Sequence, residues 1–221
     1  MNIINQKIGG FSLMRTKIEG VYIIQPAKHS DDRGYFMETY NAGALKSLTG
    51  VDYNFIQDNQ SKSSYGTVRG LHFQREPYAQ AKLVRVVSGC VYDVAVDLRP
   101  GSPTFGEHVS VELDDERNQM LLIPRGCAHG FSVLSKTAIF SYKVDNIYNK
   151  ESEGGLIYSD PNLDIDWGVP ANKIQLSGKD KQLPTLVKYL ESENNKLTAE
   201  LENAKNAILM RQIQDMKECT L

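Results

Sequence analysis

The sequence predicts an all-β fold, a sandwich or barrel of jelly-roll type with short flanking helices and a C-terminal amphipathic helix. Two observations predict it. From about Lys17 to Trp167 the chain is made of short runs rich in β-branched and aromatic residues, each bounded by turn residues. From Leu183 on, the composition changes to Lys, Glu, Leu, Ala and Asn, with a helical repeat of apolar residues.

The β-rich runs are close together, as in a jelly roll, and turn residues such as Ser88-Gly89 and Asp114-Asp115 separate them. Only Ala42 to Leu48 looks helical within this part of the chain. Residues 68–82 have the pattern strand, turn, strand, so we expect a hairpin there. The other expected strands lie within residues 18–26, 34–40, 82–100, 108–115, 119–126, 129–134 and 138–148.

We expect three segments: an N-terminal extension without a strong pattern (1–16), a jelly-roll domain (17–184) and a helical extension (185–221). Pro184 followed by Thr185 is a typical helix start. The helix either docks on its own domain or forms a short coiled coil between subunits, and its pattern leaves both open. Its stripe has alternating steps of three and four residues over Val187, Leu190, Asn194, Leu197, Leu201, Ala204 and Ile208.

The composition is that of an ordinary globular protein, with 41% apolar and 24% charged residues. A net charge of -2 provides no general attraction to nucleic acid or to an anionic membrane. No apolar run approaches the ~18 residues of a transmembrane helix, and we see no secretory signal. The cysteines Cys90, Cys127 and Cys219 are odd in number and lack metal-ligand spacing, which predicts a cytoplasmic, reducing environment.

Two predicted strands each carry a histidine, His72 and His129, and Lys82 follows the first of them. An imidazole titrates near neutral pH, which makes His72 a candidate general base. If the expected hairpin returns Lys82 to the same face, its ammonium can stabilise negative charge on an oxygen. Tyr142 alternates with apolar residues and is a candidate proton donor, although a buried structural tyrosine has the same pattern.

A metal site is tested by the cupin motifs, because jelly rolls of the cupin type often bind one. Residues Pro124 to His129 match the second motif in form. The first motif needs two histidines one residue apart and a glutamate, whereas Gly70 to Gln74 contains His72 alone. We therefore expect no metal. No dinucleotide or P-loop pattern is present either, so we expect no cofactor.

Six motifs, in order, resemble the dTDP-4-dehydrorhamnose 3,5-epimerase family over about Thr16 to Pro184. The resemblance implies a dimeric, cofactor-independent, cupin-like jelly roll that binds a nucleotide sugar. The motifs are DDRGYFMETY, QDNQSKSSYGTVRGLHFQ, PRGCAHGFSVLS, the SYK that contains Tyr142, DPNLDIDW and LSGKD.

The resemblance also implies roles for single residues. His72 matches the family's catalytic base, and Asp180 matches the aspartate that pairs with it. Lys82 matches the lysine near the 4-keto oxygen, and Tyr142 the tyrosine that reprotonates from the opposite face. The substrate-binding residues implied are His129 in the sugar pocket and Arg33, Phe36, Glu38, Gln57, Asn59 and Arg69 around the nucleotide, some of them supplied by the dimer partner.

The implied reaction inverts C3 and C5 of dTDP-4-dehydro-6-deoxyglucose and yields dTDP-4-dehydrorhamnose. Because His72, Asp180, Lys82 and Tyr142 are all present, we favour inversion at both carbons. Three alternatives stay open at this point: a single-centre epimerase acting on another nucleotide-linked 4-keto sugar, a metal-dependent cupin enzyme, and a non-catalytic sugar-binding jelly roll.

Overall fold

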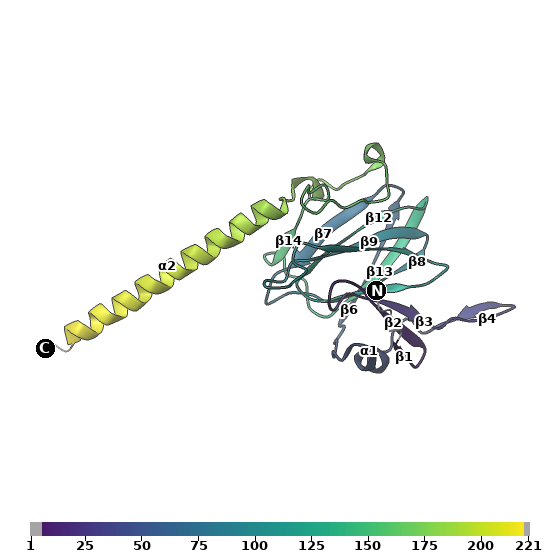
Figure 1. Ribbon diagram of the computed structural model, residues 1–221, viewed down its shortest axis with the longest axis horizontal. Helices are drawn as coiled ribbons and strands as arrows, with labels where there is room; N and C mark the ends of the chain where they lie inside the picture. The colour runs from purple at the N-terminus through teal and green to yellow at the C-terminus, as the bar shows by residue number, and fades with distance from the viewer. Residues whose placement is uncertain (1–5, 219–221) are drawn as a thin grey trace. The chain divides into compact units, whose positions relative to one another are not determined.

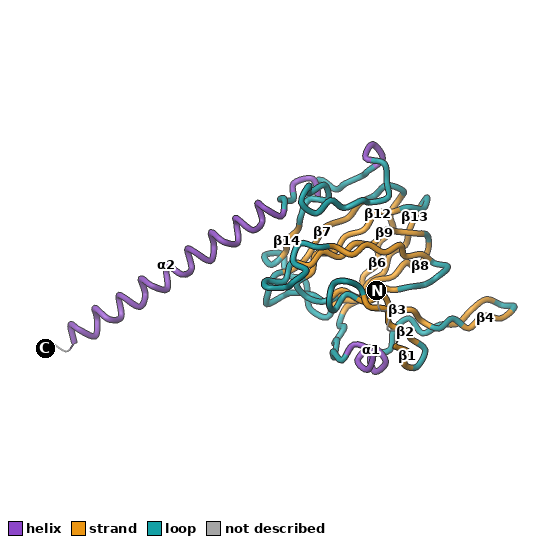
Figure 2. The backbone as a smooth tube through the Cα atoms, in the orientation of Figure 1, coloured by secondary structure: helices purple, strands orange, loops and turns teal. Residues whose placement is uncertain are grey.

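A computed structural model describes the backbone of residues 6–218 and the side chains of residues 6–199, 201, 202, 205 and 206. It confirms the predicted all-β fold, since strands dominate the chain up to Leu183 (Figure 2). The chain divides after Leu183 into two compact units, each described by itself. Within the described residues, no helix is both long enough and apolar enough to cross a membrane.

Two antiparallel sheets and a separate two-stranded ribbon make up the first unit (Figure 1). The larger sheet has the order β1 (Gln6–Ile8), β2 (Phe11–Arg15), β3 (Tyr22–Pro26), β11 (Met120–Ile123), β8 (Lys82–Ser88), β13 (Thr137–Val144), β6 (Gln57–Ser64). The smaller sheet has the order β10 (His108–Asp114), β9 (Cys90–Asp97), β12 (Cys127–Val133), β7 (Val68–Gln74), β14 (Glu153–Gly155). The ribbon is β4 (His29–Asp31) with β5 (Gly34–Phe36).

The sheets face each other across an apolar core. It combines residues of the larger sheet, such as Val84, Leu121 and Phe140, with Val91 and Phe131 of the smaller one. All of these side chains are buried. Their alternation along each strand is the pattern that predicts a sheet with one face in the core.

The outer face of the larger sheet is covered by α1 (Ala42–Thr49), where the sequence predicts a helix. The Asn41 side chain caps its first turn by accepting a hydrogen bond from the Ala44 amide, and Gly50 ends it in the left-handed region. Leu45 and Leu48 pack against this face. Because both faces of the sheet are covered here, all four residues of β11 are buried.

The predicted hairpin over residues 68–82 is wrong. Strand β7 pairs with β12 and β14 in the smaller sheet, whereas β8 pairs with β11 and β13 in the larger one. The intervening segment therefore crosses from one sheet to the other. Similarly, the run 82–100 is divided at Gly89, whose φ of 89° turns the chain from β8 into β9 of the opposite sheet.

Two other predicted segments differ from the structure. The N-terminal extension (1–16) contains β1 and β2, and β2 pairs with β3 and buries Phe11 and Leu13. This strand is short, so its period-two pattern was too brief to detect. The expected strand at 34–40 is limited to β5, because its ribbon projects from the two sheets and is solvent-exposed (Figure 1).

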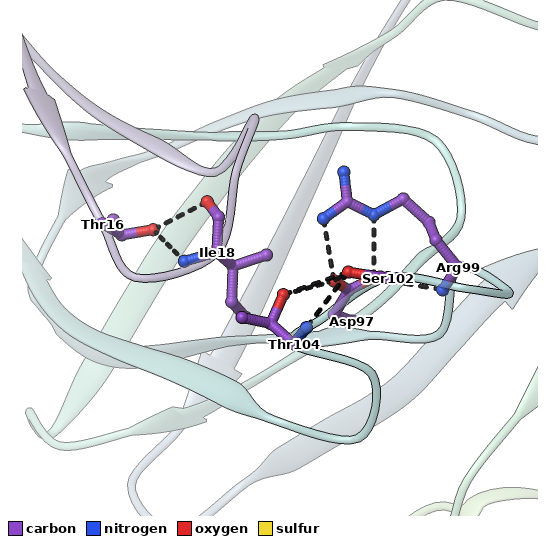
Figure 3. A network of polar contacts seen from close by, with 6 residues as sticks. All are labelled: Thr16, Ile18, Asp97, Arg99, Ser102 and Thr104. Atoms are coloured by element: carbon purple, nitrogen blue, oxygen red, sulfur yellow. Dashed lines mark hydrogen bonds and ion pairs between the residues drawn. The ribbon is translucent and has the colours of Figure 1, made fainter.

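The loop after β9 is organised by the buried carboxylate of Asp97 (Figure 3). It accepts hydrogen bonds from the Arg99 guanidinium (2.8 Å) and from the hydroxyls of Ser102 (2.6 Å) and Thr104 (2.7 Å). Burial alone would raise the pKa of Asp97, but these hydrogen bonds hold it well below its usual value. The hydrogen bonds that Asp97 accepts therefore stabilise the loop that contains the Pro100–Pro103 turn.

The second unit contains the long helix α2 (Leu186–Glu218), in the region where the sequence predicts one. Thr185 caps it, since its hydroxyl accepts from the Lys188 amide at 3.4 Å. The first unit also contains two short 3-10 helices, η1 (Ala171–Lys173) and η2 (Asp180–Gln182). Of the cysteines, Cys127 is buried and Cys90 half-buried, and neither is in a disulfide; Cys219 lies outside the described residues.

Candidate active site

The two predicted imidazoles are neighbours on adjacent strands. His72 of β7 and His129 of β12 are directly paired in register, so both side chains leave the same face of the smaller sheet. A shift in register follows His129, where Gly70 and Gly130 let the backbones approach. A Cβ on Gly70 would lie 2.6 Å from the Cα of Gly130, so this crossing requires glycine.

His72 is oriented by a carboxylate from the end of the first unit. Its Nε2 lies 2.6 Å from Oδ1 of Asp180, in η2. Ser177 donates to the other oxygen of Asp180 at 2.9 Å and accepts from its amide. An ionised carboxylate only accepts hydrogen bonds, so Nε2 donates and Nδ1 is left to accept a proton.

The environment of His72 favours the neutral imidazole. Burial lowers its pKa below the ordinary value of 6.5, and the positive charges of Lys82 and Lys179 act in the same direction. The hydrogen bond and charge of Asp180 oppose this shift without overcoming it. At neutral pH the ring is therefore able to act as a base.

Lys82 reaches the same region from the larger sheet, although the predicted hairpin is absent. It is the first residue of β8, it is buried, and its Nζ donates to the backbone carbonyl of His72 at 3.3 Å. Burial lowers the pKa of Lys82 to about 8, against the negative charges of Asp93 and Glu153. The lysine is therefore mainly protonated at neutral pH.

His129 has a carboxylate partner of its own, which the sequence did not reveal. Its Nε2 is 2.8 Å from Oδ1 of Asp93, on the neighbouring strand β9. Both side chains are buried, and His129 packs against the ring of Phe140. Burial raises the pKa of Asp93 above its usual value, and the nearby His129 and Lys82 oppose this shift without overcoming it. Asp93 thus links the second imidazole to the lysine electrostatically.

His72, Lys82 and His129 line one cavity of about 340 Å³ between the sheets, a volume within the usual range for ligand sites. Tyr142, on β13, reaches it from the larger sheet; burial raises the pKa of its phenol, which keeps it protonated at neutral pH. The cavity is lined by Asn59, Gln60, Ser61, Arg69, His72, Phe73, Gln74, Gln80, Lys82, His129, Phe131, Phe140, Tyr142, Tyr148 and Glu153.

The predicted site residues divide into two groups. Asn59, Arg69, His72, Lys82, His129 and Tyr142 line the cavity, and Asp180 stands behind His72. The other four do not line it within one chain. Arg33 and Phe36 lie on the projecting ribbon, Glu38 is exposed in the segment that follows it, and Gln57 is exposed at the start of β6, with its amide donating to Asn59.

Tyr148 and Glu153 are among the lining residues that were not identified from the sequence. The Tyr148 hydroxyl donates to Glu153 at 2.9 Å, and Lys179 forms an ion pair with the same carboxylate. Burial would raise the pKa of Glu153, but these two partners lower it. Tyr148 ends a predicted strand and Glu153 lies in no predicted element, so neither carried a spacing signal.

The loops on either side of the cavity are tied together by one buried amide. Gln74 donates to the carbonyls of Tyr78 and Ile147 at 3.2 and 3.1 Å and accepts from the amide of Asn149 at 2.7 Å. One loop joins the strand of His72 to that of Lys82, and the other joins β13 to β14. Gln74 therefore holds together the segments that carry the reactive groups.

A base, a buried cation and a protonated phenol thus face one cavity from two sheets. This set is suited to removing a proton from a carbon next to a carbonyl, stabilising the enolate oxygen and returning a proton. Among the residues that the structure describes, no group of three or more His, Cys, Asp or Glu side chains is placed to hold a metal ion.

Comparison with known proteins gives consistent matches. Residues 15–188 match the family model described as dTDP-4-dehydrorhamnose 3,5-epimerase. The Escherichia coli K12 protein of that name is 49% identical over 175 residues, 79% of this chain and 94% of that protein.

The similar solved structures include two crystal structures of epimerases. That of dTDP-4-dehydrorhamnose 3,5-epimerase from Elizabethkingia anophelis NUHP1 has a TM-score of 0.79 and 50% identity, covering 81% of this chain and 98% of the other. That of dTDP-6-deoxy-D-glucose-3,5-epimerase from Legionella pneumophila Philadelphia 1, in complex with dTDP-4-keto-L-rhamnose, has a TM-score of 0.77 and 45% identity, covering 80% and 93%.

Proposed function

The chain belongs to the dTDP-4-dehydrorhamnose 3,5-epimerase family, and we propose that its reaction takes place in the cavity between the sheets with His72 as the base. The protein is an isomerase that inverts C3 and C5 of dTDP-4-dehydro-6-deoxyglucose. The observation that carries the site assignment is the 2.6 Å contact of His72 with Asp180, beside the buried ammonium of Lys82.

The first step is removal of a proton from C3 or C5. Both C–H bonds are acidic because the electron pair left behind is delocalised onto O4 as an enolate. His72 accepts the proton and becomes an imidazolium, which Asp180 stabilises and keeps in orientation. Lys82 stabilises the enolate oxygen with a charge that burial makes effective.

The second step returns a proton to the opposite face of the carbon. The electron pair of the enolate takes the proton of the Tyr142 phenol, the 4-keto group re-forms and the centre is inverted. The resulting phenolate regains its proton from solvent, and the imidazolium releases its own. Tyr142 and His72 reach the cavity from opposite sheets, which suits attack on two faces of the sugar ring.

We expect solvent deuterium to enter both C3 and C5 when the enzyme acts on dTDP-4-dehydro-6-deoxyglucose in D₂O. Each proton that His72 removes is lost to solvent before a deuteron returns. The measurement is NMR of the two carbons. Exchange at one carbon only would indicate a single-centre epimerase. Binding without exchange would indicate a sugar-binding protein, and activity dependent on stoichiometric iron or manganese would indicate a metal enzyme.

Tyr142→Phe should separate proton loss from inversion. We expect the variant to keep exchanging substrate protons with D₂O, since His72 is intact, while inversion slows by about 10²-fold, the lower range for one positioned acid. NMR of deuterated substrate against inverted product gives the ratio. Tyr65→Phe, at an exposed tyrosine outside the cavity, is the matched control. Equal loss of exchange and inversion would show that Tyr142 does not act only in reprotonation.

We also propose that the active form is a homodimer. Arg33, Phe36 and Glu38 are exposed and lie outside the cavity of their own chain. An arrangement in which they reach the nucleotide in a partner's cavity would explain their position on or beside a projecting ribbon.

We further propose that residues 17–184 form the catalytic domain and that residues 185–221 are an addition to it. The unpaired Cys90 and Cys127 support a reducing, cytoplasmic location.

A further inference from the structure

The described part of α2 presents an apolar stripe to solvent. Val187, Leu190, Leu197 and Leu201 are 48%, 40%, 64% and 56% exposed. They are the large apolar side chains that the structure shows exposed on this helix, and with Asn194 they follow steps of three and four residues. Such spacing places all five residues on one face.

This face is additional to the catalytic part of the family. The family model ends at residue 188, and the Escherichia coli and Elizabethkingia anophelis proteins are matched over 94% and 98% of their length by only 79% and 81% of this chain. A helix of 33 residues is about 50 Å long. In water most helical stability comes from packing of an apolar face, so the stripe requires a covering surface.

We propose that the stripe is covered by the same helix of a second copy of this chain, in a parallel, in-register coiled coil. The average step of 3.5 residues is the coiled-coil repeat, which keeps one seam facing a partner along its length. Val187 occupies an a position, and Leu190 and Leu197 occupy d positions. A β-branched residue at a with leucine at d favours two parallel strands.

Asn194 identifies the second copy as the partner. At an a position its amide can donate to and accept from the same residue of an identical helix, but only when the two are parallel and in register. In an antiparallel pair, a positions face d positions, so Asn194 would face a d residue of the partner and not a second asparagine, and its amide would lose that polar partner. The asparagine is therefore less costly in this pairing than in the others, which selects for it.

The charges beside the stripe are compatible with this pairing. Glu193 is at a g position, which in a parallel pair faces the e position of the next heptad in the partner. That residue is Thr198, which is uncharged, so no like charges meet there. Lys196 of the same helix donates to Glu193 at 2.8 Å, which partly neutralises this carboxylate beside the stripe.

Disulfide trapping in the full-length chain tests the proposal. Leu190→Cys and Leu197→Cys are made separately in a Cys219→Ser background, with Ala199→Cys as the control; Ala199 is exposed two residues from Leu197 but off the stripe. We expect each stripe variant to form a linked dimer roughly 10²-fold faster than the control at micromolar protein, because pairing raises the local thiol concentration to the millimolar range. Non-reducing gels and intact mass give the rates.

The outcomes separate the competing arrangements. Self-linkage at both Leu190 and Leu197 requires a parallel, in-register pair, because an antiparallel pair brings a residue opposite itself only near its centre. Rates equal to the control at both positions, or linkage at one position alone, would overturn the proposal. Unchanged epimerase activity in each variant shows that the catalytic domain is folded. Failure of the deuterium test would leave this result unaffected, so the two proposals are judged independently.

Discussion

His72→Asn is expected to lower kcat and kcat/KM for epimerisation by about 10³-fold and to stop deuterium exchange at both carbons, since one positioned base typically contributes ~10²–10⁴-fold. Asparagine matches only the near part of the imidazole in shape, and it has no group that accepts a proton near neutral pH. Because substrate contacts from the other lining residues remain, dTDP binding measured by calorimetry should change little. The effect is therefore on chemistry.

The pH dependence provides a second test of His72. Its pKa is lowered from 6.5 mainly by burial, so the neutral base is present at neutral pH and is lost as the pH falls through a value below 6.5. We expect the acid limb of kcat/KM there. His108→Asn, at a half-buried histidine of β10 outside the cavity, should retain the wild-type rate and profile. Near-normal exchange in His72→Asn would make the base assignment wrong.

The parts of the fold that could be predicted are those with a local signal. Strand β9, with its apolar residues, and helix α1, with its Asn41 and Gly50 caps, lie where the sequence indicates them. Strand β6, with the sequence QDNQSKSS, was missed because it is a polar edge strand with little apolar alternation. The separation of β7 and β8 into opposite sheets depends on long-range pairing, which short motifs do not encode.

For the candidate active site too, only residues with a local sequence signal could be predicted. His72, Lys82 and Tyr142 could be proposed from residue type and strand position, and all three line the cavity. The aspartate beside each histidine could not be chosen by spacing, because Asp180 is 108 residues from His72 and Asp93 is 36 residues from His129. The family resemblance supplied Asp180, and only the three-dimensional structure pairs Asp93 with His129.

Lys82→Met is the second variant with a large expected effect. Methionine has a similar length and fits a buried position, but it cannot stabilise the enolate oxygen. We expect kcat/KM at pH 7 to fall by about 10²–10³-fold, the cost of removing one donor from a developing oxyanion. The rate is measured by epimerisation and by deuterium exchange. Lys136→Met, at an exposed lysine between β12 and β13, is the control and should leave the rate unchanged.

The alkaline limb of the pH profile distinguishes loss of charge from loss of packing. The ammonium is the form that stabilises an enolate, and burial lowers its pKa to about 8. Wild-type kcat/KM should therefore decline as the pH rises through about 8, and the residual activity of Lys82→Met should lack this decline. Tyr142 does not provide an alternative source, because its pKa is raised above 10. An unchanged limb near pH 8 in Lys82→Met would assign that titration to another group and remove the lysine from its proposed role.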